Sequence, residues 1–302
     1  MNSNPIDPIS DVYFSKLNEF INGDKNVYLT LGGIGDLLLL LAVCYKNEKV
    51  HIVCIANDES SQFSKKFLDY FNLKYIFYKN LKGHECIKAL YNKIIVHPNF
   101  NLSAHLPVNF NWKDWINIDK YKNRLVIETD WLDLIGIKKR DKKYVVICPS
   151  GSQKCEHRKR HLNVEEYNTI VRVYLEKGYE VITASSKKDL NIYNFYQDKN
   201  CYWLTDSELI NHKGVSHEID FNTFLQTVIS CDDIISTDTW IKTFMSLCGK
   251  PCHVIKTRFN SKYQHVGKEP NDNIFLNKEF WPKLKIHTYE QFIEYLSQMP
   301  EA

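Results

Sequence analysis

The chain has 302 residues, of which 44% are hydrophobic and 25% charged, a composition typical of a globular protein and unlike that of disordered, collagen-like or coiled-coil chains. This length suits two domains, and a net charge of +3 gives no bulk attraction to nucleic acid or membranes. The longest apolar run, residues 37–43, is too short to cross a bilayer. The nine cysteines form no CxxC pair, and the amino terminus does not resemble a signal peptide. We therefore expect a cytoplasmic protein with reduced thiols.

The first half of the sequence alternates predicted strands with predicted helices. Residues 26–31 and 50–56 are short apolar runs rich in β-forming residues, and residues 37–45 favour a helix. The other expected elements are strands at residues 74–77 and 93–97 and helices at residues 60–71, 85–91 and 125–135. Residues 98–119 interrupt the pattern, and their Asn, Pro and aromatic content predicts a long ordered loop. The alternation is typical of a mostly parallel sheet with helices on both faces.

The second half repeats this alternation. It begins with a predicted strand at residues 144–148, and a helix at residues 164–177 is expected to end at Gly178, because glycine commonly terminates helices. The remaining expected elements are strands at residues 180–184, 233–236 and 252–255 and helices at residues 222–231, 239–247 and 288–297. We therefore expect two similar α/β domains with a substrate cleft between them. Their expected limits are residues 1–140 and 141–285, with a terminal helix at residues 286–302.

A glycine cluster lies between the first predicted strand and the first predicted helix. Gly32, Gly33 and Gly35 allow a sharp turn and the close approach of a ligand, and the helix start offers free N–H groups to an anion. The third glycine of the dinucleotide fingerprint is missing, since Leu38 stands in its place. Asp36 is placed to act as a general base, and its charge disfavours phosphate beside it. The alternatives are a simple tight turn and a helix cap by Asp36.

A second polar cluster follows the first strand of the second half. Ser150, Gly151 and Ser152 offer hydroxyl and backbone N–H groups, and a basic run that includes Lys159 and Arg160 comes soon after. Hydroxyls, amides and guanidinium groups together suit a diphosphate. The alternative is a solvated basic loop.

A third polar cluster joins the predicted strand at residues 233–236 to the helix that follows it. Asp238 and Thr239 lie at the carboxyl end of this strand, where open α/β sheets bind ligands. The alternative is that Asp238 is an ordinary N-cap.

The spacings that would indicate a metal site are incomplete. His157 and His161 are four residues apart, as are Cys248 and Cys252, but no second pair with ligand spacing accompanies either set. A basic loop and buried thiols explain these residues better. We therefore expect neither a metal ion nor a bound cofactor.

The three polar clusters together resemble the heptosyltransferase family, glycosyltransferase family 9, whose members have two Rossmann-like domains in the GT-B arrangement. The matching segments are Gly35-Asp36, residues 132–137, Ser150-Gly151, residues 160–167 and residues 232–251. The resemblance implies a divergent GT-B glycosyltransferase that moves a sugar from a nucleotide sugar to an acceptor hydroxyl. It implies metal-independent displacement with inversion.

The resemblance also implies roles for individual residues. Asp36 would deprotonate the acceptor hydroxyl, and Arg160, at the family's lysine position, would neutralise the leaving diphosphate. The expected donor-binding residues are Ser150, Gly151, Ser152, Lys159, Arg160, Asp238, Thr239 and Thr243. Trp240 and Thr243 stand where the family has glycine and histidine, so one half of the donor site differs from the family pattern.

The acceptor is expected to be a sugar of lipopolysaccharide or another glycan. The alternative is a hydroxylated base in DNA, because the lysine-rich residues 138–143 and 154–160 suit a phosphate backbone. Aromatic side chains within residues 99–115 would stack equally well on a sugar or a base.

Two other classes of function remain as alternatives. A nucleotide-sugar-binding protein without catalysis would account for Trp240 and Thr243, although Asp36 speaks against it. A nicotinamide-dependent oxidoreductase would require the full glycine fingerprint, which the chain lacks.

Overall fold

The computed structural model divides the chain into two compact units, Met1–Tyr121 and Lys122–Ala302. The described residues of the first unit are 15, 19–20, 26–30, 34–35, 37–38, 41, 50–56, 58–79 and 100–102. The described residues of the second unit are 128–137, 140–151, 161–193, 198–237, 239–256 and 283–302. The domain limits expected from the sequence, at residues 140 and 285, stay predictions.

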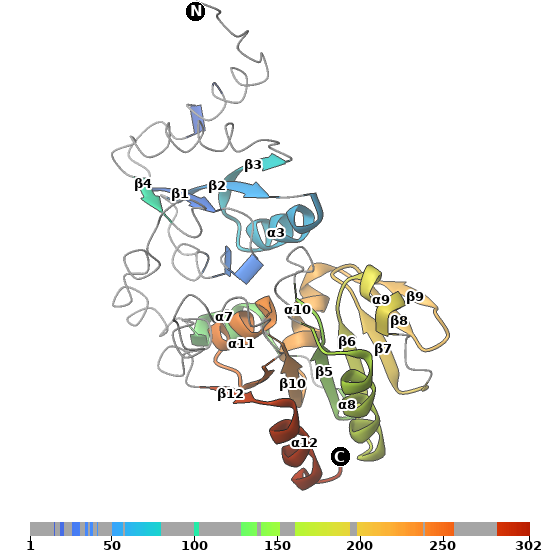
Figure 1. Cartoon of the computed structure of the whole chain (residues 1–302). Coiled ribbons are helices and arrows are strands. Elements are labelled where there is room, and N and C mark those ends of the chain that lie inside the picture. The colour runs from blue at the N-terminus through green and yellow to red at the C-terminus, as the bar shows by residue number, and fades with distance from the viewer. Residues whose placement is uncertain are drawn as a thin grey trace, which may run out of the picture. The chain divides into compact units, whose positions relative to one another are not determined.

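The first unit contains a four-stranded parallel sheet in the order β3-β2-β1-β4 (Figure 1). The strands are β1 (Asn26–Thr30), β2 (Val50–Ala56), β3 (Lys74–Lys79) and β4 (Phe100–Leu102), and helix α3 (Asp58–Tyr70) connects β2 to β3. Strands β1, β2 and β3 and helix α3 confirm four of the elements expected from the sequence.

Strand β4 corrects the expectation of a loop throughout residues 98–119. Its three residues pair with β1, with Phe100 opposite Val27. A strand this short has too little alternation to be recognised from sequence, and it is fixed by the unpaired edge of β1 that it covers. The strand expected at residues 93–97 and the helix expected at residues 85–91 lie outside the described residues.

The second unit contains an eight-stranded sheet in the order β12-β11-β10-β5-β6-β7-β8-β9. Its strands are β5 (Tyr144–Cys148), β6 (Glu180–Ala184), β7 (Cys201–Leu204), β8 (Glu208–Asn211), β9 (Ser216–Glu218), β10 (Asp233–Ser236), β11 (Cys252–Ile255) and β12 (Leu284–His287). The run from β12 to β7 is parallel, whereas β8 and β9 are antiparallel additions at the β7 edge. Taken in chain order, the parallel strands follow the 3-2-1-4-5-6 order of doubly wound dinucleotide-binding sheets.

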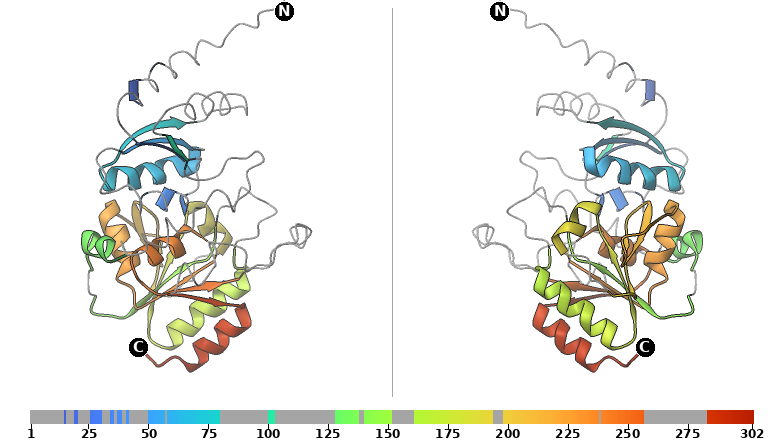
Figure 2. Two further views of the ribbon diagram at one scale, coloured as in Figure 1. Left: turned by 90° about the vertical axis from the view of Figure 1, so that its left-hand side faces the viewer. Right: turned by 90° about the vertical axis from the view of Figure 1, so that its right-hand side faces the viewer.

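Helices cover both faces of this second sheet (Figure 2). On one side lie α8 (Val164–Glu176) and α12 (Tyr289–Gln298), with the short α9 (Lys187–Tyr193) packed against α8. On the other side lie α7 (Glu128–Ile135), α10 (Phe221–Ile229) and α11 (Trp240–Leu247). Because both faces are covered, every residue of β5 is buried. The expectation of an α/β protein with a mostly parallel sheet is confirmed.

Local sequence accounts for the ends of the best-patterned helix. Asn163 caps α8 by accepting a hydrogen bond from the N–H of Glu166, at 2.8 Å, and the Glu166 carboxylate accepts one from the N–H of Asn163 at 2.9 Å. Gly178 follows the helix with a φ of 87°, a left-handed conformation that glycine adopts without strain. The predicted helix at residues 164–177 and its glycine stop are therefore confirmed.

The described cysteines test the expectation of reduced thiols, and the described helices test whether any segment could span a membrane. Cys148, Cys201, Cys231, Cys248 and Cys252 take part in no disulfide, and all except Cys231 are buried. These five agree with the expectation of reduced thiols. Within the described part of the chain, no helix has the length and apolar character needed to span a membrane.

Replacing Asn163 with Ala should lower the free energy of unfolding by about 1 kcal/mol, because the side-chain acceptor that caps the N–H of Glu166 at the start of α8 is lost. Urea denaturation followed by circular dichroism measures this change. The control is Asn191→Ala, since Asn191 is exposed within α9. An equal effect of the two substitutions would show that the cap does not stabilise α8.

Candidate functional site

The strand order of the second unit places a topological switch point between β5 and β10. From β5 the chain moves to β6 on one side, whereas β10 lies beside β5 on the other side. Such a switch point is where open α/β sheets bind ligands, at the carboxyl ends of the strands. Cys148 and Ser236, the last residues of β5 and β10, lie opposite each other. The N–H of Thr237 donates to the Cys148 carbonyl at 3.3 Å, so the two strand ends leave the sheet together.

The segment after β10 forms the start of α11. Thr239 is the N-cap of this helix, and its Oγ1 accepts from the N–H of Ile241 at 3.3 Å. The same oxygen lies 2.7 Å from Oγ of Ser236, which in turn donates to the Thr237 carbonyl at 2.8 Å. The N-cap is therefore Thr239 and not Asp238, because the cap must directly precede the first helical residue, Trp240. Thr239 is buried, and its side chain is used in holding the helix start at the switch point.

Thr243 lies one turn further along α11 and is buried, as is every residue of this helix from 241 to 247. Its neighbour Lys242 is also buried, with 3% of its surface exposed. A role of Thr243 in donor binding stays a prediction.

Ser150 and Gly151 lie directly after β5, at the same edge. Ser150 forms an isolated antiparallel bridge with His161, and the N–H of Leu162 donates to the Pro149 carbonyl at 2.9 Å. These contacts bring together the two ends of the segment that contains the basic run. The expected ligand-binding residues Ser152, Lys159 and Arg160 belong to that segment and lie outside the described residues.

The Ser150 side chain belongs to a hydroxyl cluster around Asp189 of α9. Ser150 Oγ donates to Oδ2 of Asp189 at 2.7 Å, and the same carboxylate oxygen accepts from Ser185 at 2.5 Å and from Ser186 at 3.0 Å. Ser150 and Ser185 also lie 2.8 Å apart, oxygen to oxygen. Asp189, Ser185 and Ser186 were not predicted as site residues from the sequence. The signal that was available is a Ser-Ser pair at the end of a strand, followed by a carboxylate in the first turn of the next helix.

The glycine cluster of the first unit is described only in part. Gly35 and Ile34 are helical, as are Leu37, Leu38 and Leu41, and these three leucines are buried. The helix after β1 therefore starts earlier than the expected residue 37. The expected residues Gly32, Gly33 and Asp36 lie outside the described residues, as does Asp238 of the second unit.

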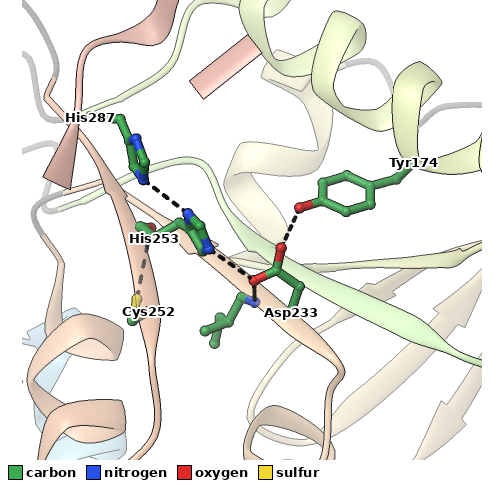
Figure 3. Close-up of polar contacts among 6 residues, drawn as sticks. Tyr174, Asp233, Cys252, His253 and His287 are labelled. Atoms are coloured by element: carbon green, nitrogen blue, oxygen red, sulfur yellow. Dashed lines mark hydrogen bonds and ion pairs between the residues drawn. The ribbon is translucent and has the colours of Figure 1, made fainter. Parts of the chain in front are cut away.

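A different polar cluster, around Asp233 and His253, lies at the opposite end of β10. Asp233, the first residue of β10, accepts from the Tyr174 hydroxyl at 2.6 Å and from the N–H of Ile234 at 2.9 Å (Figure 3). Its Oδ1 lies 3.5 Å from Nε2 of His253, and Nδ1 of His253 lies 3.0 Å from Nε2 of His287. Asp233 and His253 come from the neighbouring strands β10 and β11, and Tyr174 comes from α8.

Burial sets the charges of the Asp233 and His253 cluster. Burial, together with the nearby Lys285 and His287, lowers the pKa of His253 to about 3. Burial also raises the pKa of Asp233 and keeps that of Tyr174 well above its usual range. His253 is therefore neutral at neutral pH, and its contact with Asp233 is not an ion pair. Phe292 and Tyr295 of α12 pack against the His253 ring, with ring centroids 5.5 and 4.5 Å away. This closed arrangement fits a core polar network rather than a ligand site.

No group of three histidine, cysteine or acidic residues within the described ranges is arranged to hold a metal ion. The spacing of Cys248 and Cys252 noted in the sequence corresponds to two buried thiols outside disulfides, one after α11 and one in β11.

Comparisons with known proteins gave matches among solved structures. No protein-family model and no curated protein matches the chain. A glycosyltransferase family 9 structure from Veillonella parvula is similar with a TM-score of 0.47 and 11% identity, over 89% of this chain and 96% of that one. E. coli heptosyltransferase WaaC with ADP-2-deoxy-2-fluoro heptose is similar with a TM-score of 0.45 and 8% identity, over 89% of this chain and 98% of that one. The structure of the same enzyme with ADP has a TM-score of 0.42 and 8% identity, over 90% of this chain and 100% of that one.

The His253 network predicts a loss of stability in acid. The folded protein holds His253 neutral, whereas the unfolded chain protonates it near its ordinary pKa, so its contribution is present above pH 6.5 and is lost towards pH 3. Between about pH 7.5 and about pH 5 the wild type should lose about 2 kcal/mol more unfolding free energy than His253→Gln.

The measurement is urea denaturation at each pH. Replacement of the exposed His217 by Gln is the matched control and should leave the acid loss unchanged. If the wild type and His253→Gln lose stability in parallel, another group is responsible for the acid dependence.

Proposed function

We propose that the protein is a glycosyltransferase that moves a sugar from a nucleotide-sugar donor to an acceptor hydroxyl. The observation that carries the proposal is the switch point between β5 and β10, where Gly151 and the Thr237–Thr239 turn follow adjacent strand ends. Nucleotides bind doubly wound sheets at such a point. The sequence resemblance to the heptosyltransferase family in this half of the chain supports the same reading.

The switch point offers groups suited to a diphosphate. The amino-terminal end of α11 carries the positive end of the helix dipole and the backbone N–H groups of its first turn. Gly151 has no side chain to block the approach of a phosphate to the backbone. The expected cations Lys159 and Arg160 belong to the segment whose ends meet at Ser150 and His161. Together these groups would stabilise the negative charge that grows on the leaving nucleoside diphosphate.

In the proposed reaction Asp36 takes the proton of the acceptor hydroxyl. The acceptor oxygen then forms a bond to the anomeric carbon of the sugar as the bond between that carbon and the diphosphate breaks. A single displacement of this kind inverts the anomeric configuration. Arg160 neutralises the departing diphosphate, so the proposed mechanism needs no metal ion.

The acceptor is proposed to be a sugar of lipopolysaccharide or another glycan. A hydroxylated base in DNA is the second candidate, because the lysine-rich residues 138–143 and 154–160 suit a phosphate backbone.

The position of Trp240 bears on the alternative of a protein that binds nucleotide sugars without catalysis. The Trp240 ring packs against Phe224 of α10 and Phe244 of α11, with ring centroids 6.0 and 5.8 Å away. The large side chain at the family's glycine position thus contributes to helix packing in the second unit. This packing removes one of the two arguments for the binding protein, and Thr243 remains the other.

Replacing Asp36 with Asn should reduce sugar transfer by about 10²- to 10⁴-fold, because the base is lost while the shape of the side chain is kept. Donor affinity, measured as the thermal shift with a panel of nucleotide sugars, should stay unchanged. A ligand at 100 times its dissociation constant stabilises a fold by about 2.7 kcal/mol, which is easily measured as a shift in melting temperature.

The matched control is Asp133→Asn, since Asp133 is exposed on α7. Equal loss of transfer and donor binding in Asp36→Asn would assign Asp36 to the donor site or to the fold. No thermal shift of the wild-type protein with any nucleotide sugar would contradict the transferase proposal itself.

A further inference from the structure

The hydroxyl cluster at the ends of β5 and β6 is built around one buried carboxylate. Asp189 is only 4% exposed, whereas Ser150 and Ser185 are partly exposed and Ser186 is exposed. All three serines lie within hydrogen-bond distance of Asp189 Oδ2, at 2.7, 2.5 and 3.0 Å. The cluster thus joins a carboxylate beneath the edge of the sheet to hydroxyls that reach its surface.

The number of hydrogens fixes the direction of these bonds. A serine hydroxyl has one hydrogen and two lone pairs, whereas a carboxylate oxygen only accepts. The three serines therefore have three hydrogens for four contacts, namely three to Asp189 and one between Ser150 and Ser185. Ser186 contacts only Asp189, so its hydrogen goes to that carboxylate. When each serine uses its hydrogen within the cluster, the hydrogen of Ser150 goes either to Asp189 or to Ser185. Ser150 then has no hydrogen left for a ligand, and a lone pair is what it offers.

We propose that Asp189 is a positioning residue that makes Ser150 a hydrogen-bond acceptor for the ligand. This inference rests on the proposed binding of a nucleotide sugar at the β5 and β10 strand ends. Ser150 accepts from a hydroxyl or N–H of the nucleoside part, and it does not donate to phosphate as the sequence resemblance implies. The diphosphate is bound instead by Gly151 and the start of α11.

The buried charge acts in the same direction as the hydrogen count. The Asp189 carboxylate lies 2.7 Å behind the Ser150 hydroxyl, and burial weakens the screening of its charge by water. A phosphate on Ser150 would face this negative charge at short range, whereas a sugar hydroxyl or a base N–H is neutral. Asp189 thereby makes the β5–β6 end of the site selective for the uncharged part of the ligand.

The experiment measures two dissociation constants by calorimetry, for inorganic pyrophosphate and for the nucleoside diphosphate that stabilises the wild-type protein most. Ser150→Ala should weaken the nucleoside diphosphate about five- to tenfold, as expected for one lost hydrogen bond, and leave pyrophosphate within about twofold. Asp189→Asn keeps the shape of the side chain, removes its charge and frees hydroxyl hydrogens. It should therefore strengthen pyrophosphate binding and weaken the nucleoside diphosphate.

Ser207→Ala is the matched control, because Ser207 is an exposed serine after β7 at the same edge of the sheet. Opposite changes for the two probes in Asp189→Asn distinguish positioning from a general loss of structure, which would weaken both. If Ser150→Ala weakens pyrophosphate as much as the nucleoside diphosphate, Ser150 is a phosphate donor and the inference is wrong. If the wild-type protein binds no nucleoside diphosphate at all, the proposed function fails and this inference fails with it.

Discussion

The parallel pairing of β5 with β10 is the constraint on which the rest of the second unit depends. It places Cys148 opposite Ser236 in the middle of the eight-stranded sheet, so two chain segments almost ninety positions apart leave the sheet side by side. Covering helices on both faces bury β5 completely, and the ends of the strands are left as the places where polar groups can meet a ligand. The start of α11 derives its position beside the end of β5 from this pairing. The neighbouring pairing of β5 with β6 adds the hydroxyl cluster at the same edge of the sheet.

Two carboxylates in this unit, the buried Asp189 and the partly buried Asp233, show how similar chemistry leads to different roles. Asp233 is satisfied by Tyr174 and the N–H of Ile234, inside a network closed by the rings of α12. Asp189 is satisfied by serine hydroxyls at the carboxyl ends of β5 and β6. The first network, which holds the buried His253 neutral, stabilises the fold and makes it sensitive to acid. A network that ends in partly exposed hydroxyls transmits the orientation of the buried group to whatever binds there.

The parts predictable from sequence are those that depend on local chemistry. The strand at residues 144–148 and the helix at residues 164–177 were predictable because one is a buried β-rich run and the other has a capping box and a glycine stop. Strand β4 was not, because its three residues are fixed by pairing with β1. Asp189 was missed for the same reason, since its contact with Ser150 spans 39 positions and exists only because β5 and β6 are neighbours.

The central claim is that a nucleotide binds at the strand ends of β5 and β10. Hydrogen–deuterium exchange with and without a nucleoside diphosphate tests it most directly, because backbone N–H groups at the start of α11 are the proposed phosphate ligands. We expect slower exchange in peptides that cover residues 148–151 and 236–241, with no change around Asp233 and His253. Protection confined to other peptides, or no protection with any nucleoside diphosphate, would contradict it.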